Sequence, residues 1–278
     1  QFYGYDDKGK RGLSSGSFEL SEKINNNSNI TVDIGQVLFK PTVTISSDIL
    51  RQFNAKKHAK PNKWIISEVE DGGGGIVPYS YKENNFVNAL QWVIGLELFL
   101  LVKNPYQVFL TTDHPNGAPF TSYPELLRLL MDLDFRNSHL NKINKFAVKM
   151  SNLKNIKRVY SLYEIAIMTR SSPAKLLGLH DRGSLKPGCI ADISIYDPKK
   201  KIDEMFSKAS YVFKDGENIV KDGKIIKLKK GTTQTLKLNF DKRINKDLQR
   251  WFDKSYSLDL ETFVVDENFF PENNFKIH

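Results

Sequence analysis

Residues 108–117 read Val-Phe-Leu-Thr-Thr-Asp-His-Pro-Asn-Gly, and this stretch carries more information about the fold than any other. Its first five residues are apolar or β-branched, which predicts a short buried strand that ends at Asp113. The segment 86–102 is apolar nearly all round, which predicts a helix sandwiched between layers. An apolar, β-branched segment at 29–39 predicts an earlier strand buried on both faces. This strand, helix, strand order indicates a parallel sheet with helices outside it.

A helix signal follows the motif. Pro124 fits the first turn of a helix, and Thr121 or Ser122 is the predicted cap. The predicted buried stripe of this helix consists of four leucines: Leu126, Leu127, Leu130 and Leu133. This helix would complete a second crossover connection of the predicted parallel sheet.

The pattern changes in the last third of the chain. Ser161-Leu-Tyr-Glu164 is a capping box that opens a short helix, and Pro173 starts another helix that ends at Gly178. Asp215-Gly216 and Asp222-Gly223 are strong hairpin signals. The short strands that these turns separate are predicted at 190–196, 211–214, 218–221 and 224–228. We therefore expect an α/β domain over 1–180 and a small antiparallel β unit with a C-terminal tail over 181–278.

The composition of the chain limits which partners and which cellular location we expect. The net charge of +9 would suit a nucleic acid if the basic residues clustered, but apolar and acidic residues interrupt the densest basic stretch, 221–230. We expect no nucleic-acid partner, while an acidic substrate or an acidic protein partner remains compatible with the charge. The most apolar segment, 90–102, is too short to span a bilayer, so we expect no membrane association. With the single Cys189 and no signal peptide, the expected location is cytoplasmic.

Asp113 is the leading candidate for chemistry. A carboxylate at the C-terminal end of a barrel strand can bind a metal ion and can take a proton from metal-bound water. The competing structural interpretation is that Asp113 caps the following turn through Asn116 or Gly117. His114 could be a metal ligand, a proton carrier or a substrate contact, or simply a hydrogen-bonded surface residue.

Other polar residues carry weaker signals. Asp33 is a second buried-carboxylate candidate, with pairing to a backbone donor as the structural alternative. Glu97, inside the apolar helix, needs a partner such as an arginine or a backbone donor. Three acidic residues beside the glycine run at 72–75 would form a mobile lip or simply a solvated surface: Glu68, Glu70 and Asp71. The remaining histidines are expected to be structural or solvated: His58, His139, His180 and His278.

Three segments together resemble one family. Segment 108–124 is similar to the strand-8 motif of the A subunits of formylmethanofuran dehydrogenase and formyltransferase/hydrolase complexes, and 89–101 resembles the helix before it. Segment 161–179, followed by Gly183-x-Leu-x-x-Gly-x-x-Ala-Asp192, resembles the tail of many amidohydrolases. The resemblance implies the C-terminal part of a (β/α)₈ TIM-barrel amidohydrolase, beginning near barrel strand 6. A small antiparallel β-sandwich unit would follow.

The resemblance also implies an activity. In that family the A subunit works in a multi-subunit complex and uses two zinc ions to interconvert N-formylmethanofuran, a formamide, with formate and methanofuran. The resemblance assigns a catalytic and metal-binding role to Asp113. We expect His114 and Asn116 to bind substrate. The family's His-x-His pair, bridging lysine and later histidines have no counterpart, so these residues alone should be inactive. We expect about 250–300 further residues with those ligands upstream of Gln1, enough for a barrel of typical size.

The direction of the reaction and two alternatives remain open. Segment 129–137 resembles the methylotroph-type complex, which hydrolyses formyl groups, more than the methanogen-type complex, which makes the formamide. One alternative is another metal-dependent amidohydrolase, either dihydroorotase-like or an N-acyl amino-acid hydrolase. The other is a non-catalytic scaffold subunit. Zinc content and turnover of N-formyl amines would separate the three.

Overall fold

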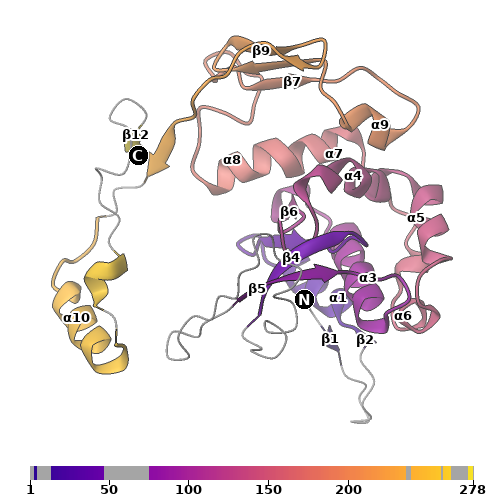
Figure 1. Ribbon diagram of the computed structural model, residues 1–278, viewed down its shortest axis with the longest axis horizontal. Helices are drawn as coiled ribbons and strands as arrows, with labels where there is room; N and C mark the ends of the chain where they lie inside the picture. The colour runs from indigo at the N-terminus through magenta and orange to yellow at the C-terminus, as the bar shows by residue number, and fades with distance from the viewer. Residues whose placement is uncertain are drawn as a thin grey trace. The chain divides into compact units, whose positions relative to one another are not determined.

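The computed structural model describes residues 3–4, 14–46, 75–235, 239–257, 259–263 and 275–277. The chain divides into two compact units. Unit 1 contains Gln1–Ile45 and Ile76–Lys227, and unit 2 contains Ser46–Gly75 and Leu228–His278. Unit 1 holds a central pair of parallel strands, most of the described helices and a four-stranded sheet (Figure 1). The domain boundary that the sequence predicts between residues 180 and 181 stays a prediction.

Two parallel strands lie at the centre of unit 1. β3 (Val32–Gly35) pairs in parallel with β6 (Val108–Thr111), and this confirms the predicted parallel arrangement. Both strands are shorter than predicted. Just after β3, the Gln36 side chain is buried, and its Nε2 donates to the Val37 and Trp92 carbonyls at 2.8 and 3.1 Å.

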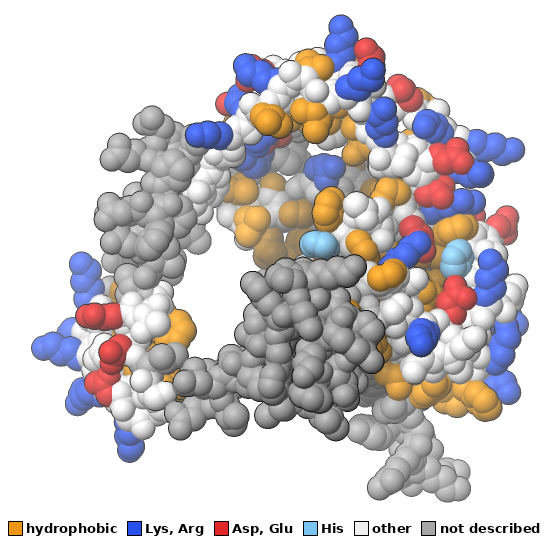
Figure 2. Space-filling view, in the orientation of Figure 1, with side chains coloured by type: hydrophobic (Ala, Val, Ile, Leu, Met, Phe, Trp, Pro, Cys, Tyr) orange, Lys and Arg blue, Asp and Glu red, His pale blue; other side chains and the backbone are white. Residues whose placement is uncertain are grey.

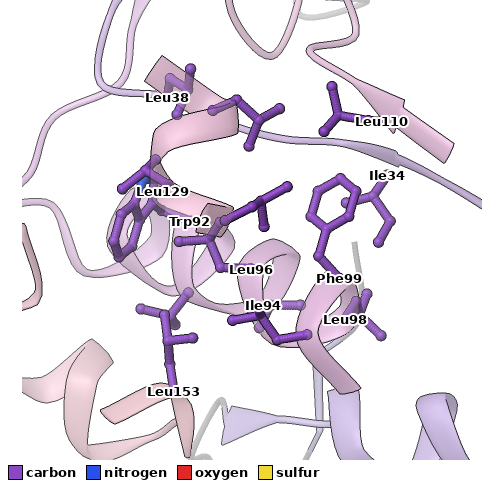
Figure 3. Packing of buried hydrophobic residues seen from close by; sticks show 14 of the residues in the cluster. Ile34, Leu38, Trp92, Ile94, Leu96, Leu98, Phe99, Leu110, Leu129 and Leu153 are labelled. Carbon is purple, nitrogen blue, oxygen red and sulfur yellow. The ribbon is translucent and has the colours of Figure 1, made fainter. Parts of the chain in front are cut away.

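The helix α3 (Phe86–Leu101) forms the middle of the core, as predicted. Asn85 caps it by accepting a hydrogen bond from the Asn88 backbone N–H, and nearly every later position is buried. Figure 3 shows Ile34 of β3 beside Phe99 of α3, so one face of the strand pair packs against this helix. A helix that is apolar all round is stable only between layers, and this one lies between the strands and other helices.

Buried Glu97 of α3 has three donors. They are the hydroxyls of Ser15 in β2 (Ser14–Ser15) and Ser17 in α1 (Ser17–Asn25), and the backbone N–H of Asn152. The expected backbone donor is therefore present, and hydroxyls take the place of an arginine. A buried carboxylate with three donors avoids most of its desolvation penalty.

Pro124 lies in the first turn of α4 (Tyr123–Met131), and Ser122 stands at its N-cap position, both as predicted, but Ser122 does not cap the helix through its side chain. The chain enters α4 from the 3₁₀ turn η4 (Phe120–Ser122), so Ser122 already has helical dihedral angles and its side chain makes no capping bond. Three of the four predicted leucines are buried, whereas Leu133 is half-buried and begins α5 (Leu133–Leu140). The short helix α6 (Lys145–Lys149) follows.

One helical run replaces the two predicted helices. The Ser161–Glu164 capping box opens α7 (Leu162–Ala166), as predicted. Pro173 lies in the first turn of α8 (Ser172–Leu176), as predicted, but a π-helical turn, η6 (Ile167–Ser171), joins this helix to α7 without a break. The wider turn shifts the hydrogen-bond register just before Pro173, which has no N–H to donate. Gly178 follows with φ of 69°, the left-handed conformation expected after a helix end.

The predicted antiparallel unit is present. β7 (Ile193–Ile195), β8 (Tyr211–Lys214), β9 (Glu217–Lys221) and β10 (Lys224–Ile225) form one sheet in the order β10-β9-β8-β7. Both Asp-Gly turns adopt positive φ, as type I′ hairpins require. The helix α9 (Ile202–Phe206) packs on α4 through an ion pair of 3.2 Å between Asp203 and Arg128. The second layer of a β-sandwich stays a prediction.

The remaining elements are small. β1 (Tyr3–Gly4) pairs antiparallel with β2, and β4 (Pro41–Ser46) pairs with β5 (Gly75–Ser80). Unit 2 holds β11 (Thr233–Thr235), α10 (Ile244–Ser255), η7 (Leu260–Phe263) and β12 (Phe275–Ile277). No described helix has the length and apolar character to cross a bilayer. On the face in Figure 2, basic side chains are interspersed with acidic ones.

Candidate active site

The candidate site is the turn 112–117 at the C-terminal end of β6. Asp113 is exposed and has φ of 49°, and its carbonyl accepts hydrogen bonds from the N–H groups of Asn116 (2.6 Å) and Gly117 (2.9 Å). Its carboxylate Oδ2 accepts a further bond from Asn116 Nδ2 at 2.7 Å. Asp113 thus makes the turn contacts of the structural interpretation, and its carboxylate also stands at the strand end that the functional interpretation requires.

The strand β4 holds the other side of this turn. The Val43 N–H donates to the Pro115 carbonyl at 3.2 Å, and the Thr44 hydroxyl donates to Asn116 Oδ1. With its oxygen bonded to Thr44, the Asn116 amide presents its NH₂ group to Asp113. Asn116 therefore orients the Asp113 carboxylate rather than pointing freely into solvent.

His114 is exposed, and one of its ring nitrogens is already engaged. Nδ1 accepts the backbone N–H of Phe120 at 3.2 Å, and the imidazole meets the Phe120 ring edge-on with centroids 5.1 Å apart. Because Nδ1 is an acceptor, the neutral ring carries its proton on Nε2. The Nε2 proton is then the hydrogen-bond donor that the ring has left for another partner.

Asp33 shares the face of the strand pair on which the Asp113 turn begins. It alternates with Ile34, which points to the core, and it lies opposite Phe109 in the parallel register. Partial desolvation, together with the negative charge of Asp113, raises the pKa of Asp33. The prediction of a buried, backbone-paired carboxylate is wrong, because Asp33 is exposed and has no hydrogen-bond or salt-bridge partner in the described part of the chain.

The other sequence candidates lie apart from this turn. His139 packs between Phe135 and Trp92, as a structural histidine would, and His180 is exposed. Cys189 is half-buried. Five candidates lie outside the described residues: His58, Glu68, Glu70, Asp71 and His278.

A zinc ion needs more donors than this turn supplies. Catalytic zinc takes three or more protein ligands from His, Cys, Asp and Glu. Over the described ranges, no three such side chains are grouped to hold a metal ion. Asp113 can supply one carboxylate, but the described residues do not make a complete metal site by themselves.

Sequence reasoning missed the residues that fix the turn from outside it. Gly35 abuts Asp113, and a glycine inside a strand pattern is a signal of close approach. The contact from Thr44 has no comparable local signal, because nothing in a strand sequence tells which loop it touches.

Comparison with known sequences assigns the chain to a family. A sequence model of the amidohydrolase family matches residues 3–226. The chain belongs to this family. The A subunit of the formyltransferase/hydrolase complex Fhc of Methylorubrum extorquens is 45% identical over 98% of this chain and 51% of that protein. Protein FwdA of Methanocaldococcus jannaschii is 37% identical over 97% of this chain and 49% of that protein.

A search of solved structures also finds a chain of a formyltransferase/hydrolase complex. In the crystal structure of the formyltransferase/hydrolase complex FhcABCD from Methylorubrum extorquens with methylofuran, one chain matches with a TM-score of 0.81 and 44% identity. The match covers 99% of this chain and 51% of that one. The resemblance to A subunits is therefore confirmed, and the chain spans about half the length of the relatives that it matches.

Proposed function

We propose that this chain is the C-terminal part of a cytoplasmic amidohydrolase of the A-subunit type, which cleaves the formamide of an N-formylmethanofuran-type substrate to formate and the free amine. The observation that carries the proposal is the exposed Asp113 turn at a strand end, in a chain 45% identical to the A subunit of an Fhc complex. The TIM barrel, the β-sandwich and a complex with other subunits belong to the same proposal. Hydrolysis is the proposed direction.

The chemistry needs a proton acceptor and later a proton donor. Water adds to the formyl carbon, the C–N bond breaks, and the amine nitrogen gains a proton. We assign both proton transfers to the Asp113 carboxylate, held in place by Asn116 through its 2.7 Å bond. His114 Nε2 would donate to a substrate oxygen.

Zinc would supply Lewis-acid polarisation of the carbonyl and a water of lowered pKa. Asp113 would be one ligand. Since the described residues do not complete a metal site, a dinuclear centre needs ligands from elsewhere in the full-length protein. The zinc content of the purified full-length protein tests this requirement directly.

The test uses the full-length protein with its native partner subunits. We expect hydrolysis of N-formyl amines, little turnover of cyclic amides or N-acyl amino acids, and stoichiometric zinc. Preference for cyclic amides would favour the dihydroorotase-like alternative. A protein with neither zinc nor turnover would be a scaffold subunit, and the proposed activity would be wrong.

A further inference from the structure

The side chain of Asp113 lies directly against the main chain of Gly35, across the β3–β6 pair. A methyl group built on Gly35 would come within 2.6 Å of the Asp113 Cβ and 3.4 Å of its Cγ. Non-bonded carbon atoms are most stable about 3.5–4.0 Å apart. No side chain larger than hydrogen therefore fits at position 35 while Asp113 keeps its place.

Position 35 requires glycine because there is no room for a side chain, not because its backbone conformation is unusual. Gly35 is the last residue of β3 and lies opposite Thr111 in the parallel register. Its φ is outside the left-handed region, so alanine can adopt the same backbone. The atom that alanine would meet is a Cβ, which moves only when its backbone moves. A substitution at Gly35 would thus displace the backbone of the turn that carries Asp113.

The turn cannot move aside without breaking hydrogen bonds that hold it on both sides. The Gln36 N–H donates to the Thr111 carbonyl at 3.0 Å on one side, and Asn116 is bonded to Thr44 on the other. A Cβ on Gly117 would lie 2.5 Å from the Thr112 carbonyl oxygen, so the turn is compact at its far end as well.

We propose that Gly35 is a positioning residue for Asp113: by having no side chain, it sets where the Asp113 carboxylate stands at the strand end. The functional consequence rests on the proposed function, in which that carboxylate moves the proton. The geometric consequence, a displaced Asp113 in any larger variant at position 35, does not depend on it.

The kinetic test compares Gly35→Ala with Ile34→Val in the full-length protein with its partner subunits. Ile34 is the neighbouring residue on the core side of β3, so its variant loses a buried methyl group without approaching Asp113. We expect Gly35→Ala to lower kcat on an N-formyl amine about 10–100-fold, as ångström-scale misplacement does, with KM nearly unchanged. Ile34→Val should leave kcat nearly unchanged. In an Asp113→Asn background, Gly35→Ala should cause almost no further loss; an equal loss in both backgrounds would overturn the proposal.

Crystal structures of the wild-type protein and Gly35→Ala provide a readout that needs no activity. We expect the Asp113 carboxylate to be shifted in the variant, with the rest of β3 and β6 superposing. An unshifted Asp113 would overturn the proposal even if kcat fell. If the wild-type protein does not hydrolyse formamides, the proposed function fails, while the shift or its absence still decides the positioning role.

Discussion

The Asn116 side chain donates a hydrogen bond to the Asp113 carboxylate over 2.7 Å, and its own oxygen is bonded by Thr44. A strand-end carboxylate is thereby oriented by an amide that a separate strand holds in place. Asn116 makes both contacts although its sequence context is that of an ordinary turn residue.

The first prediction concerns that amide. Asn116→Ala removes a charge-assisted bond, which contributes about 1.5–3 kcal/mol, so kcat on a formamide should fall about tenfold or more. Thr44→Val is the matched control, because it removes only the indirect contact, and its loss should be smaller. Steady-state kinetics of the full-length protein measure both variants. A larger loss in Thr44→Val than in Asn116→Ala would contradict this order.

The second prediction concerns the buried Arg136. Its guanidinium donates to the carbonyls of Leu129, Ile156 and Arg158 at 3.0, 3.1 and 2.8 Å, and it has no exposed surface. Arg136→Met should lower the free energy of unfolding by about 2–4 kcal/mol, because three carbonyls lose their donor.

Arg136→Lys tests the geometry of this contact. Lysine keeps the charge but cannot match the planar guanidinium with its several N–H donors. It should therefore recover less than half of the free energy of unfolding that Arg136→Met loses. Arg250→Met on α10, where the side chain is 77% exposed, is the control and should have no effect. Denaturant unfolding measures all three variants, and a neutral Arg136→Met would contradict the prediction.

The third prediction is a pH dependence at the start of α7. Burial opposes ionisation of Glu164, but hydrogen bonds from Ser161 and an ion pair with Arg158 outweigh it, so the pKa lies below its usual 4.5. A depressed pKa means that the ionised form stabilises the fold above pH 4.5, and that this contribution disappears as the pH falls through the folded-state pKa.

Glu164→Gln isolates this contribution, because glutamine can still complete a capping box. At pH 7 the variant should be less stable by about 0.5–1 kcal/mol, the range of a partly exposed ion pair. The difference should shrink below pH 4.5. Thermal unfolding at several pH values measures it, and a difference that grows on acidification would contradict the prediction.

Elements encoded by local patterns were predicted well from the sequence. The helix at 86–102, the capping box at 161–164 and both Asp-Gly hairpins follow from periodicity, capping chemistry and turn conformation within a few residues. The π-helical turn before Pro173 was missed, because proline is an equally good sign of a new helix.

The site was predictable only in part. Asp113 could be chosen because it follows an apolar strand, but its neighbours depend on contacts distant in the chain. The approach of Gly35, the hydroxyl of Thr44 and the exposure of Asp33 depend on how β3, β4 and β6 meet. Register between strands of large sequence separation is a tertiary property, and no local pattern specifies it.

The fourth prediction tests the central claim, that the Asp113 carboxylate performs the proton transfers. Asp113→Asn keeps the shape and the turn but cannot accept a proton. Asp222→Asn is the matched control, because Asp222 is another exposed turn aspartate, with φ of 50°. The measurement is kcat on an N-formyl amine for the full-length protein, with zinc content and thermal unfolding determined on the same samples. We predict that Asp113→Asn loses about 10²–10⁴-fold in kcat with an unchanged fold, while Asp222→Asn keeps wild-type turnover. Near-normal turnover by Asp113→Asn with metal bound would contradict the account.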